Sequence, residues 1–127
     1  MEETYFWLAD IYFKGKNFKE SLFYSEKLKN EFPESKFVPW IYLLEGDIYI
    51  NLGDKKNAER NYKTVINMQE TQDVFEVAYS KLLDFYFQED DFVNLLEYSR
   101  KYLEIFPKGE IEKKVYYYLG EAYYSQG

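Results

Sequence analysis

The 127-residue sequence contains no cysteine and no histidine. The absence of cysteine excludes disulfides, thiolate nucleophiles and thiolate metal ligands, and it leaves the redox compartment open. The absence of histidine excludes Ser-His-Asp triads, HExxH zinc sites and histidine proton shuttles. We therefore expect no metal site.

Nucleotide-binding motifs are also absent, because neither a GxxxxGK[S/T] nor a GxGxxG loop occurs. The acidic run Glu89-Asp90-Asp91 lacks the EF-hand pattern and is interpreted as a solvated turn. Paired-carboxylate catalysis is formally left open, since 23 residues are Asp or Glu. The sequence predicts a protein that is not an enzyme and uses no cofactor.

Positive charge is in short supply, and the formal net charge is −7. Binding to nucleic acid or to anionic lipid needs a cationic face, so neither partner is expected. No apolar run of about 18 residues occurs, and we expect no direct membrane insertion. The first residues, Met1-Glu2-Glu3-Thr4, lack the basic and apolar segments of a signal peptide.

What the sequence does contain is a repeat of 37 residues. Two tyrosine registers keep this spacing: Tyr5, Tyr42, Tyr79 and Tyr116, then Tyr12, Tyr49, Tyr86 and Tyr123. An acidic register holds Asp10, Asp47, Asp84 and Glu121, and an apolar register holds Phe13, Ile50, Phe87 and Tyr124. A period between about 20 and 50 residues indicates a solenoid, and we expect most of the tyrosines to pack between helices.

Apolar residues at helical spacing predict seven helices and no strand. Their expected ranges are 3–14, 17–31, 36–52, 55–70, 73–88, 91–106 and 110–125. Turns are predicted at Gly15, Gly53-Asp54 and Asp90-Asp91, where the residues favour turn conformations.

Prolines and a serine mark the passage from one repeat to the next. Pro33 and Pro107 are expected to stop the preceding helices. Ser35 is expected to cap the helix that follows it. Pro39 would lie in the first turn of that helix, where backbone amides have no intrahelical partner.

The repeats resemble the tetratricopeptide repeat, whose first helix has the pattern W-x-x-L-G-x-x-Y. The matching segments are Tyr5-x-x-Leu8-Ala9-x-x-Tyr12, Tyr42-x-x-Glu45-Gly46-x-x-Tyr49 and Tyr116-x-x-Leu119-Gly120-x-x-Tyr123. The third repeat departs from the pattern, with Leu83 and Leu95 at positions where small residues let paired helices approach. These two leucines should widen or tilt the third pair.

The resemblance implies an all-α, right-handed solenoid of antiparallel helix pairs with about seven helices. The implied units are repeats at 1–35, 36–72 and 73–109, and the first helix of a fourth, truncated repeat at 110–127. It also implies a non-catalytic scaffold that binds a protein or peptide partner. Phe32-Pro33-x-Ser35 and the segment 116–127 look, in addition, like repeats of two bacterial envelope proteins, the periplasmic Tol-Pal coordinator and the lipoprotein of outer-membrane barrel assembly. That similarity implies a periplasmic location.

In such repeats the first helices line a concave groove, which we expect to bind a basic, partly apolar segment. An acidic row beside an apolar row would favour such a ligand, and a solvated polar helix face is the alternative. Lys14 and Lys81 could neutralise part of the row. The predicted groove residues are Phe6, Asp10, Phe13, Trp40, Leu43, Asp47, Ile50, Asp84, Phe87, Tyr117, Glu121 and Tyr124.

The last predicted helix is aromatic on more than one face. A terminal helix normally has a polar outer side, whereas this segment holds Tyr116, Tyr117, Tyr118, Leu119, Tyr123 and Tyr124. Two interpretations stay open. Residues 1–127 are a fragment of a longer protein, or the end docks on another molecule, which includes self-association through this helix.

Overall fold

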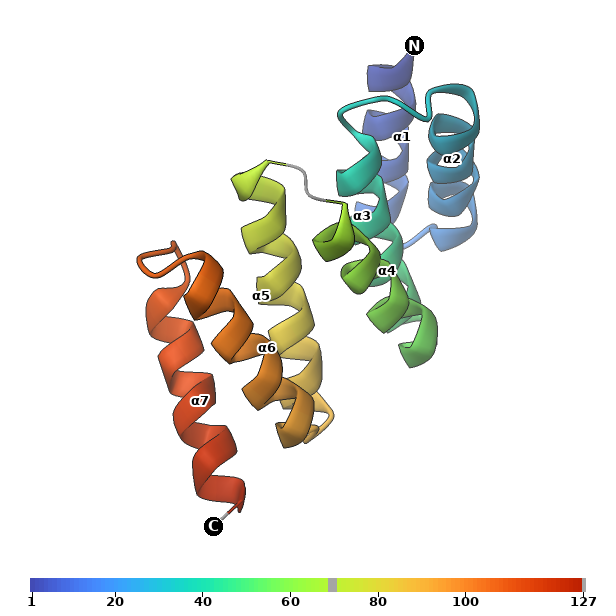
Figure 1. The fold of residues 1–127 in the computed structure, drawn as a ribbon. Coiled ribbons are helices and arrows are strands. Elements are labelled where there is room, and N and C mark those ends of the chain that lie inside the picture. The colour runs from blue at the N-terminus through green and yellow to red at the C-terminus, as the bar shows by residue number, and fades with distance from the viewer. Residues whose placement is uncertain (69–70, 127) are drawn as a thin grey trace. The chain divides into compact units, whose positions relative to one another are not determined.

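The structure, a computed structural model, describes residues 1–68 and 71–126. The described residues form seven α-helices and no β-strand (Figure 1). The helices are α1 (Glu2–Lys14), α2 (Phe18–Glu31), α3 (Val38–Asn51), α4 (Lys55–Asn67), α5 (Gln72–Gln88), α6 (Phe92–Ile105) and α7 (Glu112–Gln126). The all-α prediction is confirmed.

The helix boundaries follow the predicted ranges to within about two residues, with one exception. The helix expected at 55–70 ends at Asn67, with Met68 as its cap, and residues 69 and 70 lie outside the described part. Pro39 lies in the first turn of α3, as predicted.

The prediction that Ser35 caps α3 is wrong. The N-cap residue is Phe37, and the Ser35 hydroxyl accepts a hydrogen bond from the Phe37 amide at 3.1 Å. The serine therefore closes a local turn before the helix, which Ser side chains do when they bond an amide two residues on.

The turns inside the three helix pairs share one backbone conformation. Lys16, Gly53 and Asp90 have φ of 62°, 79° and 57°, and they are 37 residues apart. This left-handed conformation suits glycine and costs other residues free energy. In the first pair it falls on Lys16 and not on the predicted turn residue Gly15, whose φ is −81°.

The chain divides into two compact units, Met1–Glu70 with α1 to α4 and Thr71–Gly127 with α5 to α7. We call them unit 1 and unit 2. In unit 1, α1 packs against α2 and α3 against α4, and α3 also contacts α2 and α1. In unit 2, α6 packs against both α5 and α7.

Small residues bring the helices of unit 1 together. Ala9, Leu28 and Ile41 form a buried core cluster. The Ser21 hydroxyl donates a 2.7 Å hydrogen bond to the Ala9 carbonyl, which joins α2 directly to the backbone of α1. In the second pair, a Cβ atom on Gly46 would lie 2.5 Å from the Tyr62 ring. Glycine therefore leaves the room that the Tyr62 ring occupies.

The third pair is looser, as the sequence predicts. Leu83 and Leu95 are fully buried, and α5 and α6 pack less closely than α1 with α2 or α3 with α4. Two bulky side chains at the contact hold the helix axes apart. In this unit α6 makes its closer packing with α7.

A buried polar cluster supplements that packing. The Tyr102 hydroxyl donates to the Glu76 carboxylate, which also accepts the Glu110 amide at 2.8 Å. Burial, and then the bond to Glu76, raises the pKa of Tyr102 to about 12. A Cβ atom on Gly109 would collide with the Tyr102 hydroxyl. Glycine in the α6–α7 loop therefore lets the loop close over the cluster.

The tyrosine registers do pack between helices, though unevenly. Tyr79 and Tyr86 are buried, while Tyr5, Tyr12, Tyr42 and Tyr49 are half-buried. The two remaining members, Tyr116 and Tyr123 on α7, are exposed. Burial at these two registers therefore varies from one repeat to the next, and full burial occurs only on α5.

Candidate functional site

The predicted groove residues fall into three groups by exposure. Leu43 is 2% exposed and packs in the core of unit 1, so a partner cannot reach it. Ile50, Tyr117 and Tyr124 are exposed. The half-buried group is Phe6, Asp10, Phe13, Trp40, Asp47, Asp84, Phe87 and Glu121.

In unit 1 the two predicted acidic residues already have partners. Lys14 forms an ion pair with Asp10 at 3.0 Å, one turn along α1. The Tyr62 hydroxyl of α4 donates to Asp47 at 2.6 Å. The lysine expected to neutralise part of the row does so at Asp10. Asp47 orients the ring that packs on Gly46.

In unit 2 the structure brings α5 and α7 together around Asp84. This carboxylate accepts the Tyr118 hydroxyl at 2.5 Å and forms an ion pair with Lys114 at 2.7 Å. Lys114 also donates to the Ser80 hydroxyl at 2.7 Å. Burial, and then the bond to Asp84, raises the pKa of Tyr118. Asp84 therefore links α5 to α7 through one hydrogen bond and one ion pair.

These contacts change the interpretation of the acidic register. The sequence predicts a binding row or a solvated helix face, yet Asp47 and Asp84 each accept a tyrosine hydroxyl from another helix. Tyr118 and Lys114 are absent from the predicted groove residues. Their separations of 34 and 30 residues from Asp84 carry no short-range pattern, and the one available signal is opposite charge in the same unit.

Aromatic side chains lie beside Asp84. The Phe87 ring is 6.1 Å from Tyr117 and 4.8 Å from Tyr118, where the rings are stacked. Tyr117, Glu121 and Tyr124 share a face of α7 by their spacing of four and three residues. We call Asp84, Phe87, Tyr117, Glu121 and Tyr124 the first-helix surface of unit 2.

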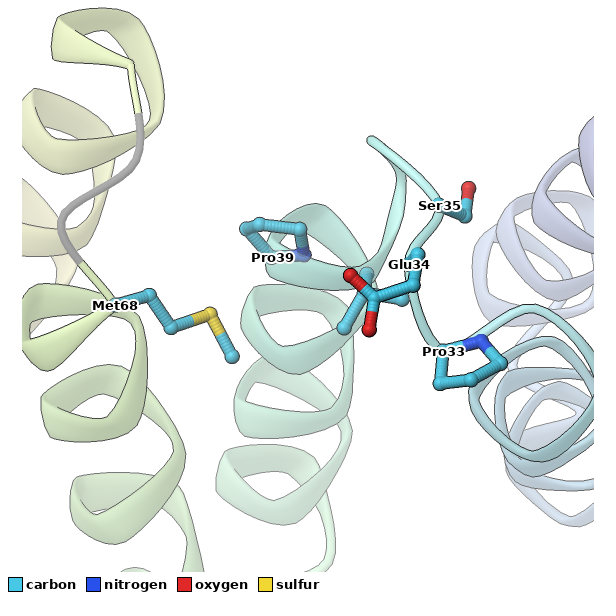
Figure 2. Close-up of a pocket in the computed structure, with 6 residues that line it drawn as sticks. Pro33, Glu34, Ser35, Pro39 and Met68 are labelled. Atoms are coloured by element: carbon cyan, nitrogen blue, oxygen red, sulfur yellow. The ribbon is translucent and has the colours of Figure 1, made fainter.

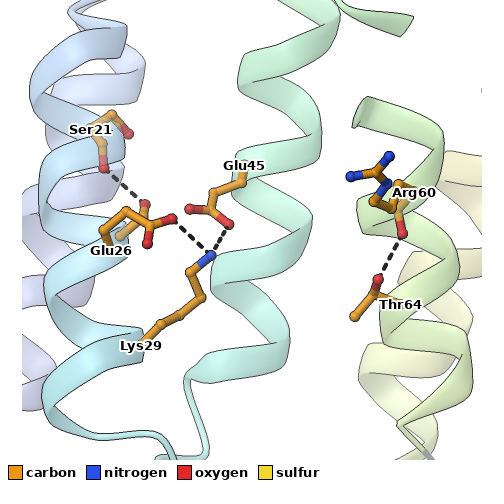
Figure 3. A network of polar contacts seen from close by, with 7 residues as sticks. Ser21, Glu26, Lys29, Glu45, Arg60 and Thr64 are labelled. Carbon is orange, nitrogen blue, oxygen red and sulfur yellow. Dashed lines mark hydrogen bonds and ion pairs between the residues drawn. The ribbon is translucent and has the colours of Figure 1, made fainter. Parts of the chain in front are cut away.

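Unit 1 contains a buried ion pair that sequence reasoning did not identify (Figure 3). Lys29 of α2 lies 2.7 Å from Glu45 Oε1 of α3 and 3.0 Å from Glu26. The Glu45 side chain is 3% exposed, and no donor among the described residues reaches its second oxygen. Burial outweighs the attraction of Lys29 and raises the pKa of Glu45 to about 7. The available signal was Glu45 at the leucine position of the repeat motif.

A shallow depression lies beside the α2–α3 loop of unit 1 (Figure 2). Its lining comprises Pro33, Glu34, Ser35, Val38, Pro39 and Met68. A single carboxylate among prolines and apolar groups supplies too few ligands for a metal ion. Elsewhere in the described part of the chain, no group of three or more acidic residues is placed to hold one. None of the described helices is both long and apolar enough to cross a membrane.

Comparisons with known proteins confirm the resemblance seen in the repeat motifs. Two family models, both described as tetratricopeptide repeat, match residues 3–35 and 41–72, about half of the chain. A search of curated proteins found no match. Repeats of this type are protein-interaction modules, which supports a scaffold role. By its repeats and its all-helical fold, the chain belongs to the tetratricopeptide repeat family.

Proposed function

We propose that this protein is a non-catalytic scaffold that binds a basic, partly apolar segment of a partner protein on the exposed faces of its first helices. The best candidate face is the first-helix surface of unit 2. Its residues combine exposed aromatic rings with carboxylates, a chemistry suited to a ligand that carries both apolar and cationic groups.

One observation carries the proposal. Tyr117 and Tyr124 are 56% and 87% exposed, although their rings are large enough to contribute strongly when buried. Tyrosine is enriched among residues that dominate binding energy at protein interfaces. Because Glu121 lies between them on the same face, an aromatic anchor and a carboxylate are presented together.

Not every carboxylate of the acidic register is available to attract a basic ligand, because lysines already neutralise two of them. Lys14 offsets Asp10, and Lys114 offsets Asp84. The local attraction is then expected to come chiefly from Glu121, with the net charge of −7 acting at longer range. Salt should weaken that attraction.

The test separates surface binding from the contacts that hold the unit together. The variant Tyr117→Ala with Glu121→Lys removes one ring and reverses one charge, and it leaves Asp84 with Tyr118 and Lys114. The matched control is Val93→Ala, an exposed apolar residue on α6. Proteins captured from cells by the wild-type chain are identified, and the purified partner is titrated calorimetrically at two salt concentrations.

We expect the double variant to weaken the purified partner's binding by about tenfold or more, as removing an interface anchor does. The control should bind like the wild type, and higher salt should weaken the wild type. Equal affinity of the double variant and the wild type would contradict the proposal.

The setting in a bacterial envelope is a separate proposal, supported by the similarity of Phe32-Pro33-x-Ser35 and of segment 116–127 to envelope repeats. Fractionation of cells that express the native protein tests it. Recovery in the envelope or periplasmic fraction is expected, and recovery in the cytoplasm alone contradicts it.

A further inference from the structure

The buried ion pair of unit 1 lies between two helix pairs and not inside one of them. Lys29 belongs to α2 of the first pair, and Glu45 belongs to α3 of the second. The two helices of each pair pack closely, whereas α3 packs less closely on α2 and α1. We call the contact of α3 with α1 and α2 the pair junction. A local opening of unit 1 is expected at this looser contact.

A carboxylate at this position of the repeat is buried at a cost. The same register holds Leu8, Leu82 and Leu119 in the other repeats, and Leu82 is fully buried. Glu45 lies almost as deep, with 3% of its side chain exposed. A leucine has no favourable hydration to lose there, whereas a carboxylate loses most of its own. The pair junction therefore contains a group whose charged form is costly to bury.

The surroundings of Glu45 satisfy only one of its two oxygens. Lys29 donates to Oε1 at 2.7 Å, while Oε2 has no hydrogen-bond partner among the described residues. The ammonium of Lys29 is also shared, since it lies 3.0 Å from Glu26 and 4.6 Å from the centre of the Tyr42 ring. One shared cation does not replace the water that an ionised carboxylate binds in solution. Protonated Glu45 therefore suits the closed junction better than ionised Glu45.

The groups that control this carboxyl lie mainly in the junction itself. After burial, the largest influences on the pKa of Glu45 are Lys29, which lowers it, and Glu26, which raises it. One turn along α3, burial and then Glu45 raise the pKa of Tyr49. Arg60 of α4 is exposed. On the other helices that pack against α3, charged side chains form ion pairs of their own, namely Asp10 with Lys14 on α1 and Glu59 with Lys63 on α4.

We propose that Glu45, Lys29 and Glu26 make the pair junction a pH-sensitive switch, which is closed when Glu45 is protonated and opens locally more often when Glu45 is ionised. In the open state, α3 and α4 separate from α1 and α2, while each pair keeps its own packing. Water then reaches both oxygens of Glu45, and Lys29 keeps its ion pair with Glu26 on the same helix. The first two repeats therefore move more freely relative to each other as pH rises.

The pH window follows from the two states of one carboxyl. In the open state Glu45 is hydrated and titrates near its ordinary pKa of 4.5, and in the closed state its pKa is about 7. Between these values the closed state binds more protons than the open state, so raising the pH favours opening. Above about pH 7 the carboxyl is ionised in both states, and the effect is complete.

The experiment introduces one thiol, which is a specific reporter because the chain contains no cysteine. Ile41 is fully buried, forms the core cluster with Ala9 and Leu28 across the junction, and lies one turn before Glu45. In Ile41→Cys the thiol can react with a disulfide reagent only after opening. The labelling rate is measured from pH 5 to 8 and divided by that of the same variant unfolded in urea, which corrects for ionisation of the thiol.

Two matched variants complete the design. Glu45→Gln in the Ile41→Cys background keeps the size of the side chain and removes its titration. Ser21→Cys places a thiol of nearly the same size as the serine at a fully buried site between α1 and α2. That site lies inside the first pair, which stays closed when the junction opens.

We expect the corrected labelling of Ile41→Cys to increase by about tenfold or more from pH 5 to 8. The Glu45→Gln background should show no such increase, and Ser21→Cys should show none either. A second measurement uses the wild-type chain and needs no cysteine: the carboxyl carbon of Glu45 is followed by NMR against pH. Its midpoint is expected near 7.

Four results would overturn the proposal. Labelling of Ile41→Cys that is constant or decreases with pH would mean that the ion pair holds the junction closed. An equal increase with Glu45→Gln would assign the effect to another group. An equal increase at Ser21→Cys would show that the first pair opens as well. An NMR midpoint for Glu45 at or below its ordinary value of 4.5 would remove the driving force. These measurements use no partner, so they are independent of the proposed function.

Discussion

Units 1 and 2 use different chemistry at the same repeat positions. In unit 1, α2 meets α3 through the buried pair Lys29 and Glu45. In unit 2 the same registers of α6 and α7 hold Leu103 and Leu119. The 37-residue period therefore preserves helix positions while allowing an ion pair to replace an apolar pair.

The positions of the large and the small side chain are also exchanged between the two helices of a pair. Gly46 faces the Tyr62 ring in the second pair. The corresponding residues of the third pair are Leu83 and Ser99, both fully buried. A large side chain thus comes from the second helix in one pair and from the first helix in the other. The comparison indicates that these two pairs fill the contact from opposite helices.

The largest expected effect comes from breaking the ion pair of unit 1. Lys29→Leu leaves the Glu45 carboxylate buried without its cation and should destabilise the protein by about 3–5 kcal/mol. Adding Glu45→Leu reproduces the leucine pair of unit 2 and should restore stability to the wild-type level or above, by about 1–4 kcal/mol. Urea unfolding of the single and double variants measures both effects. A double variant no more stable than Lys29→Leu alone would show that the units are not interchangeable here.

The next largest effect on stability is expected from changing the sizes of the side chains at Gly46 and Tyr62. Gly46→Leu drives a side chain into the Tyr62 ring and should cost about 1–3 kcal/mol or more. Adding Tyr62→Ser copies the Leu83 and Ser99 combination of unit 2 and should recover part of the loss, although Asp47 then loses its hydroxyl partner. Gly120→Leu is the matched control, expected to be neutral. Thermal unfolding distinguishes these outcomes, and an equal loss for Gly46→Leu and Gly120→Leu would contradict the packing argument.

The pH dependence of stability should distinguish the ion pair of Lys29 and Glu45 in unit 1 from the leucine pair of unit 2. The pKa of Glu45 is raised from 4.5 to about 7, so between these values the folded state binds more protons than the unfolded state. This group's contribution to stability therefore falls as pH rises from about 4.5 to 7. The pKa of Lys29 is also raised, against the lowering effect of burial, because Glu45 accepts its hydrogen bond. That shift acts only above pH 10 and does not enter this window.

The measurement is the melting temperature of the wild type minus that of the Lys29→Leu, Glu45→Leu double variant from pH 4.5 to 8. We expect this difference to decrease by a few degrees as pH rises. The other carboxylates are common to both proteins and cancel, except Glu26, which loses its ion pair with Lys29 in the double variant. A difference that increases with pH would mean that the attraction of Lys29 outweighs burial.

The smallest effect is expected at the left-handed turn positions. Lys16→Gly gives the first pair the residue that the second pair has at Gly53, and should stabilise by about 0.5–1 kcal/mol. Gly53→Ala should destabilise by a similar amount. Chemical denaturation of the two variants tests the pair, and a destabilising Lys16→Gly would show that the lysine side chain contributes more than its strained backbone costs.

The candidate surface was only partly predictable. Tyr117 and Tyr124 are exposed as the sequence indicates, whereas Leu43 is buried although it holds the same repeat register as Tyr117. A helix face can be assigned from spacing alone. How deeply a neighbouring helix covers that face depends on side-chain sizes in another part of the chain.

The sequence by itself determined the seven helices, their turns and the repeat, because helical spacing and turn residues act within a few positions of each other. It also indicated the looser third pair through Leu83 and Leu95. Only the tertiary structure decided that Asp47 and Asp84 hold helices together and that Lys29 pairs with Glu45. Hydrogen bonds and ion pairs between helices depend on distances of a few ångströms between residues far apart in sequence, which a repeat period does not specify.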